Sequence, residues 1–119
     1  MPKVVHTGII VKNMDESLKF YIGVLGFTTL SSHELPHAKL AFLEGIELLE
    51  YPNDTTERKE GMINHIAIEV EDMESAINHL KEQGVALTTD VPRNAMGGMK
   101  IFHFEGPNGE RIEFVQQPK

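Results

Sequence analysis

Two histidines and two glutamates occupy equivalent places in two similar stretches of this 119-residue chain. His65 follows His6 by 59 positions (65 − 6), and Glu113 follows Glu47 by 66 (113 − 47). Each histidine lies in the first predicted strand of its stretch, and each glutamate lies in the last. Neutral imidazoles and carboxylates suit a borderline divalent metal that keeps positions open for water or substrate. The sequence therefore indicates a metal site built from these four side chains.

The evidence for this site is the repetition, since no local motif such as HExxH is present. The offset of 59 also pairs Val11 with Val70, Asn13 with Asp72, Met14 with Met73 and Leu18 with Ile77. The strand ends GIELLEYP and RIEFVQQP share an Ile-Glu pair and a proline at the same spacing. An internal duplication with unequal loops explains both offsets.

The elements that must position these residues follow the order βαβββ twice. Hydrophobic patterning predicts strands at 4–11, 27–34, 39–43 and 46–51 in the first module, and at 63–71, 85–91, 100–105 and 110–116 in the second. One helix follows the first strand of each module, capped by Asn13 or Asp72 and stopped by Gly26 or Gly84. We expect a single α+β domain, 1–119, made of repeats at about 1–55 and 62–119.

Strand alternation predicts which faces carry the site. His6 shares its strand face with Gly8, and His65 shares its face with Ala67, so small neighbours leave room for a ligand. The first helix should pack on the opposite face through Met14, Leu18, Tyr21, Ile22 and Leu25. His33, His37, His79 and His103 have no duplicate, and we leave them outside the predicted site. His37 and His103 remain candidates for a cavity.

The overall composition limits the partners. A net charge of −7 and a pI near 5.3 argue against nucleic acid or an anionic membrane surface as a partner. There is no cysteine, so a metal must use nitrogen and oxygen ligands. No uninterrupted apolar segment of roughly 18 residues is present, which excludes a spanning helix. We expect a cytoplasmic protein.

The chain resembles the vicinal oxygen chelate superfamily, which includes glyoxalase I, methylmalonyl-CoA epimerase, extradiol dioxygenases and bleomycin-resistance proteins. The resemblance rests on HTGIIVKNMDESLKFYIGVLGF, GIELLEYP, NHIAIEVEDMESAINHLKEQGV and GPNGERIEFVQ. It implies a cupped, partly closed barrel-like sheet with helices on the convex side. It also implies one divalent metal ion (Ni, Co, Zn, Mn or Fe), held by the residues that match His6, Glu47, His65 and Glu113.

The resemblance further implies a glyoxalase I-like lyase or isomerase with a small-molecule substrate. In such enzymes a carboxylate removes a proton next to a carbonyl and the metal stabilises the enediolate, so Glu113 or Glu47 would be the base. The alternatives are an acyl-CoA epimerase, an extradiol dioxygenase, or a non-catalytic small-molecule binding or resistance protein. Small members of this size commonly form homodimers.

One departure bears on the substrate. Glyoxalase I proteins that use glutathione tend to carry an arginine four residues after the first histidine, where this chain has Ile10. This removes an expected partner for a glutathione carboxylate. ELLEYP is close to the pattern of the epimerase, but Glu34 is the only local candidate for that enzyme's additional carboxylate.

Overall fold

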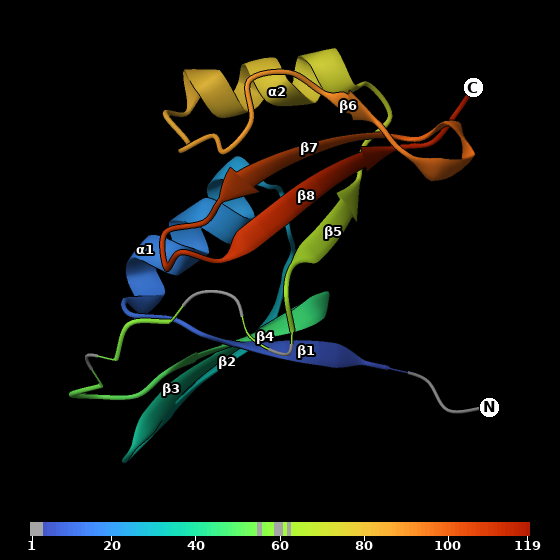
Figure 1. The fold of residues 1–119 in the computed structure, drawn as a ribbon. Helices are drawn as coiled ribbons and strands as arrows, with labels where there is room; N and C mark the ends of the chain where they lie inside the picture. The colour runs from blue at the N-terminus through green and yellow to red at the C-terminus, as the bar shows by residue number, and fades with distance from the viewer. Residues whose placement is uncertain (1–3, 55, 59–60, 62) are drawn as a thin grey trace. The chain divides into compact units, whose positions relative to one another are not determined.

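The computed structural model describes residues 4–54, 56–58, 61 and 63–119. The chain divides into two compact units, 1–57 and 58–119, and each unit contains a four-stranded sheet (Figure 1). Sheets and helices segregate within each unit, which is an α+β arrangement.

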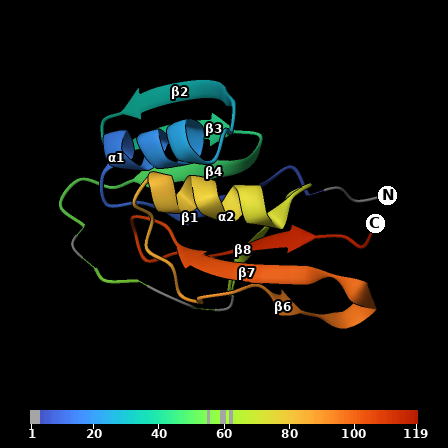
Figure 2. The same cartoon turned by 90° about the horizontal axis from the view of Figure 1, so that it is seen from above.

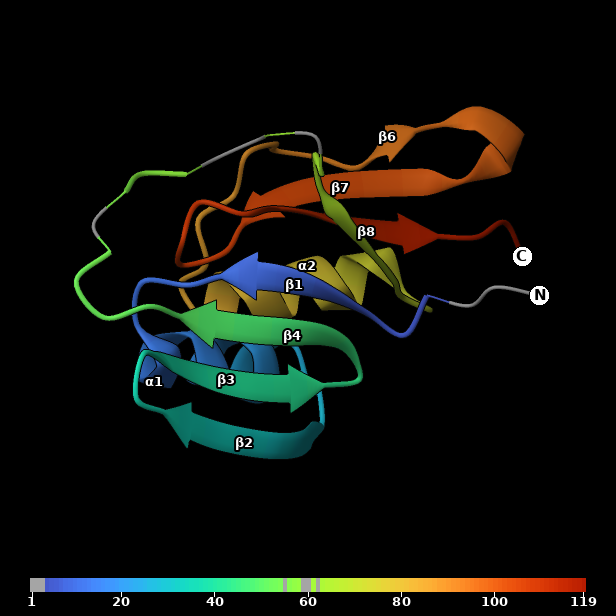
Figure 3. The same ribbon diagram turned by 90° about the horizontal axis from the view of Figure 1, so that it is seen from below.

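The first unit contains β1 (His6–Ile10), α1 (Met14–Leu18), η1 (Lys19–Val24), β2 (Thr29–Leu35), β3 (Ala38–Leu43) and β4 (Gly45–Glu50). The strand order is β1-β4-β3-β2, with β1 parallel to β4 and the other pairs antiparallel. Seen from below, the four strands lie in this order and α1 lies behind them (Figure 3). The chain thus returns beside its first strand only at β4, which places Glu47 next to β1.

The helical segment of the first unit differs in one respect from the expected stripe. After Leu18 the helix widens into the π-helical turn η1, which shifts the inward-facing side chains. Met14 and Tyr21 are buried as predicted, but Ser17 and Phe20 are buried instead of Ile22, which is 37% exposed. Gly26 ends the segment at φ +85°, a conformation that favours glycine.

The second unit contains β5 (Ile66–Glu69), α2 (Met73–Glu82), β6 (Arg93–Asn94), η2 (Met96–Gly98), β7 (Lys100–Glu105) and β8 (Arg111–Gln116). The strand order is β5-β8-β7-β6, again with the first strand parallel to the last. Figure 2 shows β8 and β7 side by side with the short β6 beyond them. Phe102, Phe104, Ile112 and Phe114 form the buried side of this sheet, and Met73, Ile77 and Leu80 are the buried residues of α2.

Two predictions in the second unit are wrong. Residues 85–91 do not form a strand, because only Leu87 forms a bridge, with Phe104. The Thr89 hydroxyl replaces a regular ladder contact there by accepting a hydrogen bond from the His103 amide at 3.3 Å. The strand expected at 63–71 is also shorter, so His65 directly precedes β5 instead of lying in it.

The duplication extends to the way the last strand holds each helix. In the first unit the Met14 amide donates to Glu50 Oε1 at 2.5 Å, and in the second the Met73 amide donates to Gln116 Oε1 at 2.6 Å. The donors differ by 59 positions (73 − 14) and the acceptors by 66 (116 − 50), the same two offsets that relate the histidines and the glutamates. Each pair satisfies an amide at a helix start that has no partner within the helix.

The fold class is confirmed, with one correction of detail. The described strands form two separate four-stranded sheets, so they do not close into a barrel. In the part of the chain that the structure describes, no helix is long and apolar enough to cross a membrane.

Candidate metal and substrate site

Each unit carries its glutamate in a row of three residues that runs across three neighbouring strands. In the first unit the register pairs Gly8 with Glu47 and Glu47 with Phe42. The row of the second unit is Ala67, Glu113 and His103. Residues in register across a sheet point to the same face, so each glutamate lies between a small and a large side chain.

The first unit brings His6 and Glu47 together. The distance between His6 Nε2 and Glu47 Oε1 is 3.4 Å, and the two side chains are 38% and 16% exposed. The His6 ring also packs edge-on against Phe42, with ring centroids 5.4 Å apart. A Cβ added to Gly8 would lie 3.8 Å from Glu47 Oε1, which places the carboxylate beside the small residue. The predicted pairing and the predicted small neighbour are therefore both present here.

In the second unit the described contacts of His65 and Glu113 are with other residues. His65 is exposed, and its Nδ1 lies 2.7 Å from Asn64 Oδ1, which also accepts from Arg111 Nη1 at 3.3 Å. Because an amide oxygen only accepts, His65 Nδ1 carries the hydrogen of this bond, and in a neutral ring Nε2 then has the lone pair. A metal-binding histidine commonly donates a hydrogen bond from its second ring nitrogen in this way.

Glu113 is held by His103, a residue that the duplication argument left out. His103 Nε2 and Glu113 Oε2 are 2.8 Å apart, and the two side chains are only 6% and 15% exposed. The Asn108-Gly109 dipeptide is typical of a two-residue hairpin turn, which by itself would place Phe104 opposite Glu113. The loop in the structure is longer, 106–110, so Glu105 pairs with Arg111 and His103 with Glu113.

The remaining histidines do not join these pairs. His33 Nε2 lies 3.1 Å from Ser31 Oγ, and His37 is exposed in the turn between β2 and β3. His79 lies on α2 and is also exposed. Among the described residues, no three histidine or acidic side chains are grouped closely enough to hold a metal. The described contacts therefore bring together His6 with Glu47 in the first unit and His103 with Glu113 in the second.

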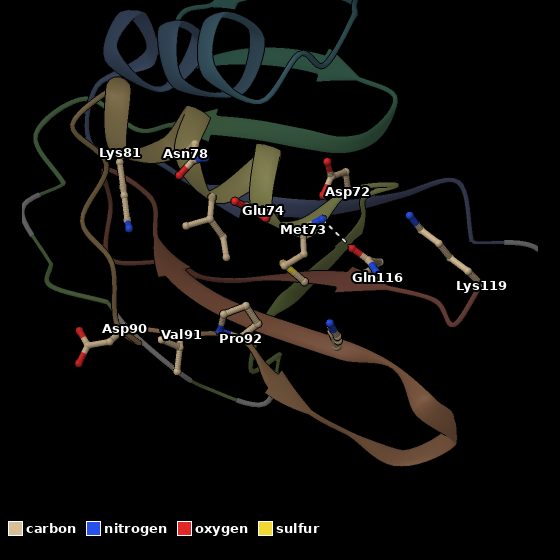
Figure 4. Close-up of a pocket in the computed structure, with 12 residues that line it drawn as sticks. Asp72, Met73, Glu74, Asn78, Lys81, Asp90, Val91, Pro92, Gln116 and Lys119 are labelled. Atoms are coloured by element: carbon tan, nitrogen blue, oxygen red, sulfur yellow. Dashed lines mark hydrogen bonds between the residues drawn. The ribbon is translucent and has the colours of Figure 1, made fainter.

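A separate pocket of about 600 Å³ lies between the start of α2, residues 90–92 and the ends of β7 and β8 (Figure 4). None of the four predicted ligands lines it, and its three lysines are balanced by Asp72, Glu74 and Asp90. The Ser75 hydroxyl donates to the Asp72 carboxylate at 2.7 Å and lowers the pKa of that exposed group. The pocket is consequently distinct from the candidate metal site.

The donor atoms fit a divalent metal in the first unit. Metal–nitrogen and metal–oxygen distances of about 2.0–2.2 Å place two ligand atoms of one ion about 3.0–3.5 Å apart. His6 Nε2 and Glu47 Oε1 satisfy this condition at 3.4 Å. In the second unit, Glu113 has Oε1 free of the hydrogen bond to His103, and His65 has Nε2 free of the bond to Asn64. The imidazole nitrogen and the carboxylate oxygen of each unit are donor types that suit a metal of intermediate softness.

Comparison with known proteins identifies the class. The family model of the Glyoxalase/Bleomycin resistance protein/Dioxygenase superfamily matches residues 3–114. The chain belongs to this superfamily.

Within the superfamily, the chain is similar to proteins named for glyoxalase activity. It is 32% identical to the lactoylglutathione lyase of Neisseria meningitidis over 97% of this chain and 91% of that protein. It also matches the structure of the trypanothione-dependent glyoxalase I of Leishmania major, with TM-score 0.82 and 26% identity over 98% of this chain and 88% of the other. An antibiotic-binding protein from Streptomyces shares the fold, with TM-score 0.74, 21% identity and coverage of 99% and 98%.

Proposed function

We propose that this protein is a metal-dependent lyase or isomerase of the glyoxalase I type. The observation that carries the proposal is the pair His6 and Glu47, whose donor atoms lie at a separation suited to one ion. The duplicated residues His65 and Glu113 supply a second imidazole and a second carboxylate. The relatives named lactoylglutathione lyase support this choice within the superfamily.

The site is proposed to use one His/Glu pair from each unit. His6, Glu47, His65 and Glu113 would hold the ion, and when bound it would act as a Lewis acid toward the substrate's oxygens. The pairs could come from one chain or from two chains of a homodimer, which we propose as the assembly. Sedimentation of a monomer at micromolar concentration would remove the dimer from the proposal.

The reaction is a proton transfer between neighbouring carbons. A carboxylate, Glu113 or Glu47, takes the proton from the carbon next to the carbonyl, and the C–H electron pair moves into an enediolate. The same carboxyl group then returns the proton to the former carbonyl carbon, and the proton of the neighbouring hydroxyl moves to the former carbonyl oxygen, so no net proton or electron is consumed. The carboxylates are 16% and 15% exposed, which limits competition from bulk water.

The proposed substrate is a hemithioacetal of a 2-oxoaldehyde. Glutathione is the first thiol to test because of the named relatives. Ile10 lies on the strand face shared by His6 and Gly8 and is 36% exposed. An apolar side chain there offers no charge to a glutathione carboxylate. We therefore expect turnover to depend less on that carboxylate than in an enzyme with arginine at this position.

The test combines metal analysis with a substrate panel of hemithioacetals, acyl-CoA esters and catechols. The expected result is hemithioacetal turnover that disappears with a chelator and returns with nickel, cobalt or zinc. Glu113→Gln should reduce kcat by about 10²- to 10⁴-fold, the usual contribution of a general base, while Glu82→Gln on the exposed side of α2 should not. Full activity of Glu113→Gln would overturn the assignment of the base.

Other outcomes of the panel identify the alternatives. Epimerisation of an acyl-CoA ester would indicate the epimerase reaction. Catechol cleavage with bound iron would indicate a dioxygenase. Tight binding of a small molecule without turnover or metal would indicate a binding protein.

A further inference from the structure

We infer that His103 is a positioning residue that fixes the carboxylate of Glu113 for metal binding. The inference rests on the proposed function for the role of Glu113, but the contact itself does not depend on it. Neither the duplication nor the four-ligand set includes His103, because its counterpart in the first unit is Phe42. The second unit therefore contains one polar group that the first unit lacks.

The direction of the hydrogen bond follows from the chemistry of its partners. An ionised carboxylate only accepts, so His103 Nε2 donates to Glu113 Oε2 across 2.8 Å. The bond occupies one oxygen of the carboxylate and leaves Oε1 available to a metal. Ligating carboxylates are themselves commonly hydrogen-bonded, and such partners fix the orientation of the ligand.

The backbone around His103 also holds the ring in place. The His103 amide donates to Thr89 Oγ1 at 3.3 Å, and its carbonyl accepts from the Thr88 amide at 3.3 Å. The side chain is 6% exposed, whereas that of His6 is 38% exposed. A buried imidazole with few alternative positions loses little entropy when it orients a neighbour.

Phenylalanine supplies the natural comparison for this role. Phe42 stands beside Glu47 in the same register position that His103 has beside Glu113. Its ring contacts His6 but cannot donate a hydrogen bond to a carboxylate. The carboxylate of Glu47 consequently has its described polar contact with the predicted ligand His6, and that of Glu113 has its contact with a residue outside the set.

The experiment compares His103→Phe with His103→Gln in the full-length protein. Phenylalanine reproduces the arrangement of the first unit and removes the donor, while glutamine keeps an N–H donor. His37→Phe, in the exposed turn between β2 and β3, is the matched control. Zinc affinity is measured by competition with a chelator, and kcat and KM are measured with the hemithioacetal. Circular dichroism confirms folding of each variant.

Loss of a group that hydrogen-bonds to a metal ligand commonly weakens metal binding about 10- to 100-fold, and we expect this for His103→Phe. In that variant kcat should fall while KM changes little, and His103→Gln should recover most of both losses. Wild-type zinc affinity in His103→Phe would overturn the inference, as would equal losses in the phenylalanine and glutamine variants.

A second readout separates this inference from the proposed function. In a ¹⁵N spectrum of the histidine rings, His103 should show a protonated Nε2 whose resonance shifts in Glu113→Gln, even without metal. If the wild type has no isomerase activity but the zinc affinities follow the expected order, the proposed reaction fails and the positioning role stands. If the resonance does not respond to Glu113→Gln, the positioning role fails whatever the activity.

Discussion

The two units place a glutamate in the same row of the same sheet and give it different partners. In the first unit Glu47 lies beside His6 at the start of β1, and Phe42 on β3 is a purely aromatic neighbour. In the second unit Glu113 is bonded to His103 on β7, while His65 is bonded to Asn64. In these two units the position of the carboxylate is the same, but the contacts that orient it differ.

The largest expected effect comes from removing either predicted imidazole ligand. His6→Ala and His65→Ala should each weaken zinc binding by more than about 10- to 100-fold, the usual effect of losing a group that only hydrogen-bonds to a metal ligand. His33→Ala, which removes a histidine bonded to Ser31, is the control. Chelator competition measures the affinities. If only one of the two alanine variants lost affinity, the equivalence of the units in metal binding would be broken.

The helix contacts give the next largest effect and test the duplication without any ligand. Glu50→Ala removes a charged hydrogen-bond acceptor and should lower the free energy of unfolding by about 1.5–3 kcal/mol. Gln116→Ala removes a neutral acceptor and should cost about 0.5–1.5 kcal/mol. Urea unfolding measures both values. A larger loss for Gln116→Ala would contradict the charge-based ranking.

The small residues of the two rows give a smaller effect. Gly8→Ala adds a Cβ 3.2 Å from Leu49 Cδ1, whose flexible end can move, so stability should change by less than about 1 kcal/mol. Ala67→Gly should cost about 0.5–1 kcal/mol because glycine in a strand loses more entropy on folding. The same urea experiments measure these changes. A loss of several kcal/mol in Gly8→Ala would show that Leu49 is rigidly held.

The smallest effect concerns Asp72 at the start of α2. Ser75→Ala removes the main cause of its lowered pKa, so the value should rise toward 3.8. A carboxyl group with a lowered folded-state pKa stabilises the protein above its unfolded pKa, and this contribution fades as pH falls through the folded pKa. The variant should therefore lose a slight stability at neutral pH. Carbon-detected NMR titration of Asp72 measures the shift, and an unchanged pKa would contradict the assigned cause.

Much of this architecture could be predicted from the sequence because the signals were local or repeated. The capping residue Asn13, whose side chain accepts from the Glu16 amide, and the stop at Gly26 were readable directly. The π-helical turn after Leu18 was not, because its pattern of apolar residues also suits a regular helix. Residues 85–91 have the composition of a strand. However, the side chain of Thr89 accepts the hydrogen bond from the His103 amide, and this contact depends on the position of β7.

The candidate site was predictable to the extent that it was duplicated. Comparison of the two copies found His6, Glu47, His65 and Glu113, but it was bound to miss His103, since its counterpart is Phe42. That contact depends on strand register, which follows from the length of the loop between β7 and β8 and not from any repeat. The contacts of a residue that differs between the two copies cannot be predicted from the duplication and are found only in the structure.

The most direct test of the account is the metal stoichiometry and ligand set of the intact protein. Elemental analysis after loading with zinc, together with X-ray absorption at the zinc edge, measures both. We expect one ion per chain with two imidazole nitrogens and carboxylate oxygens as its protein ligands. A protein that binds no metal under these conditions, or binds it without imidazole, would contradict the account.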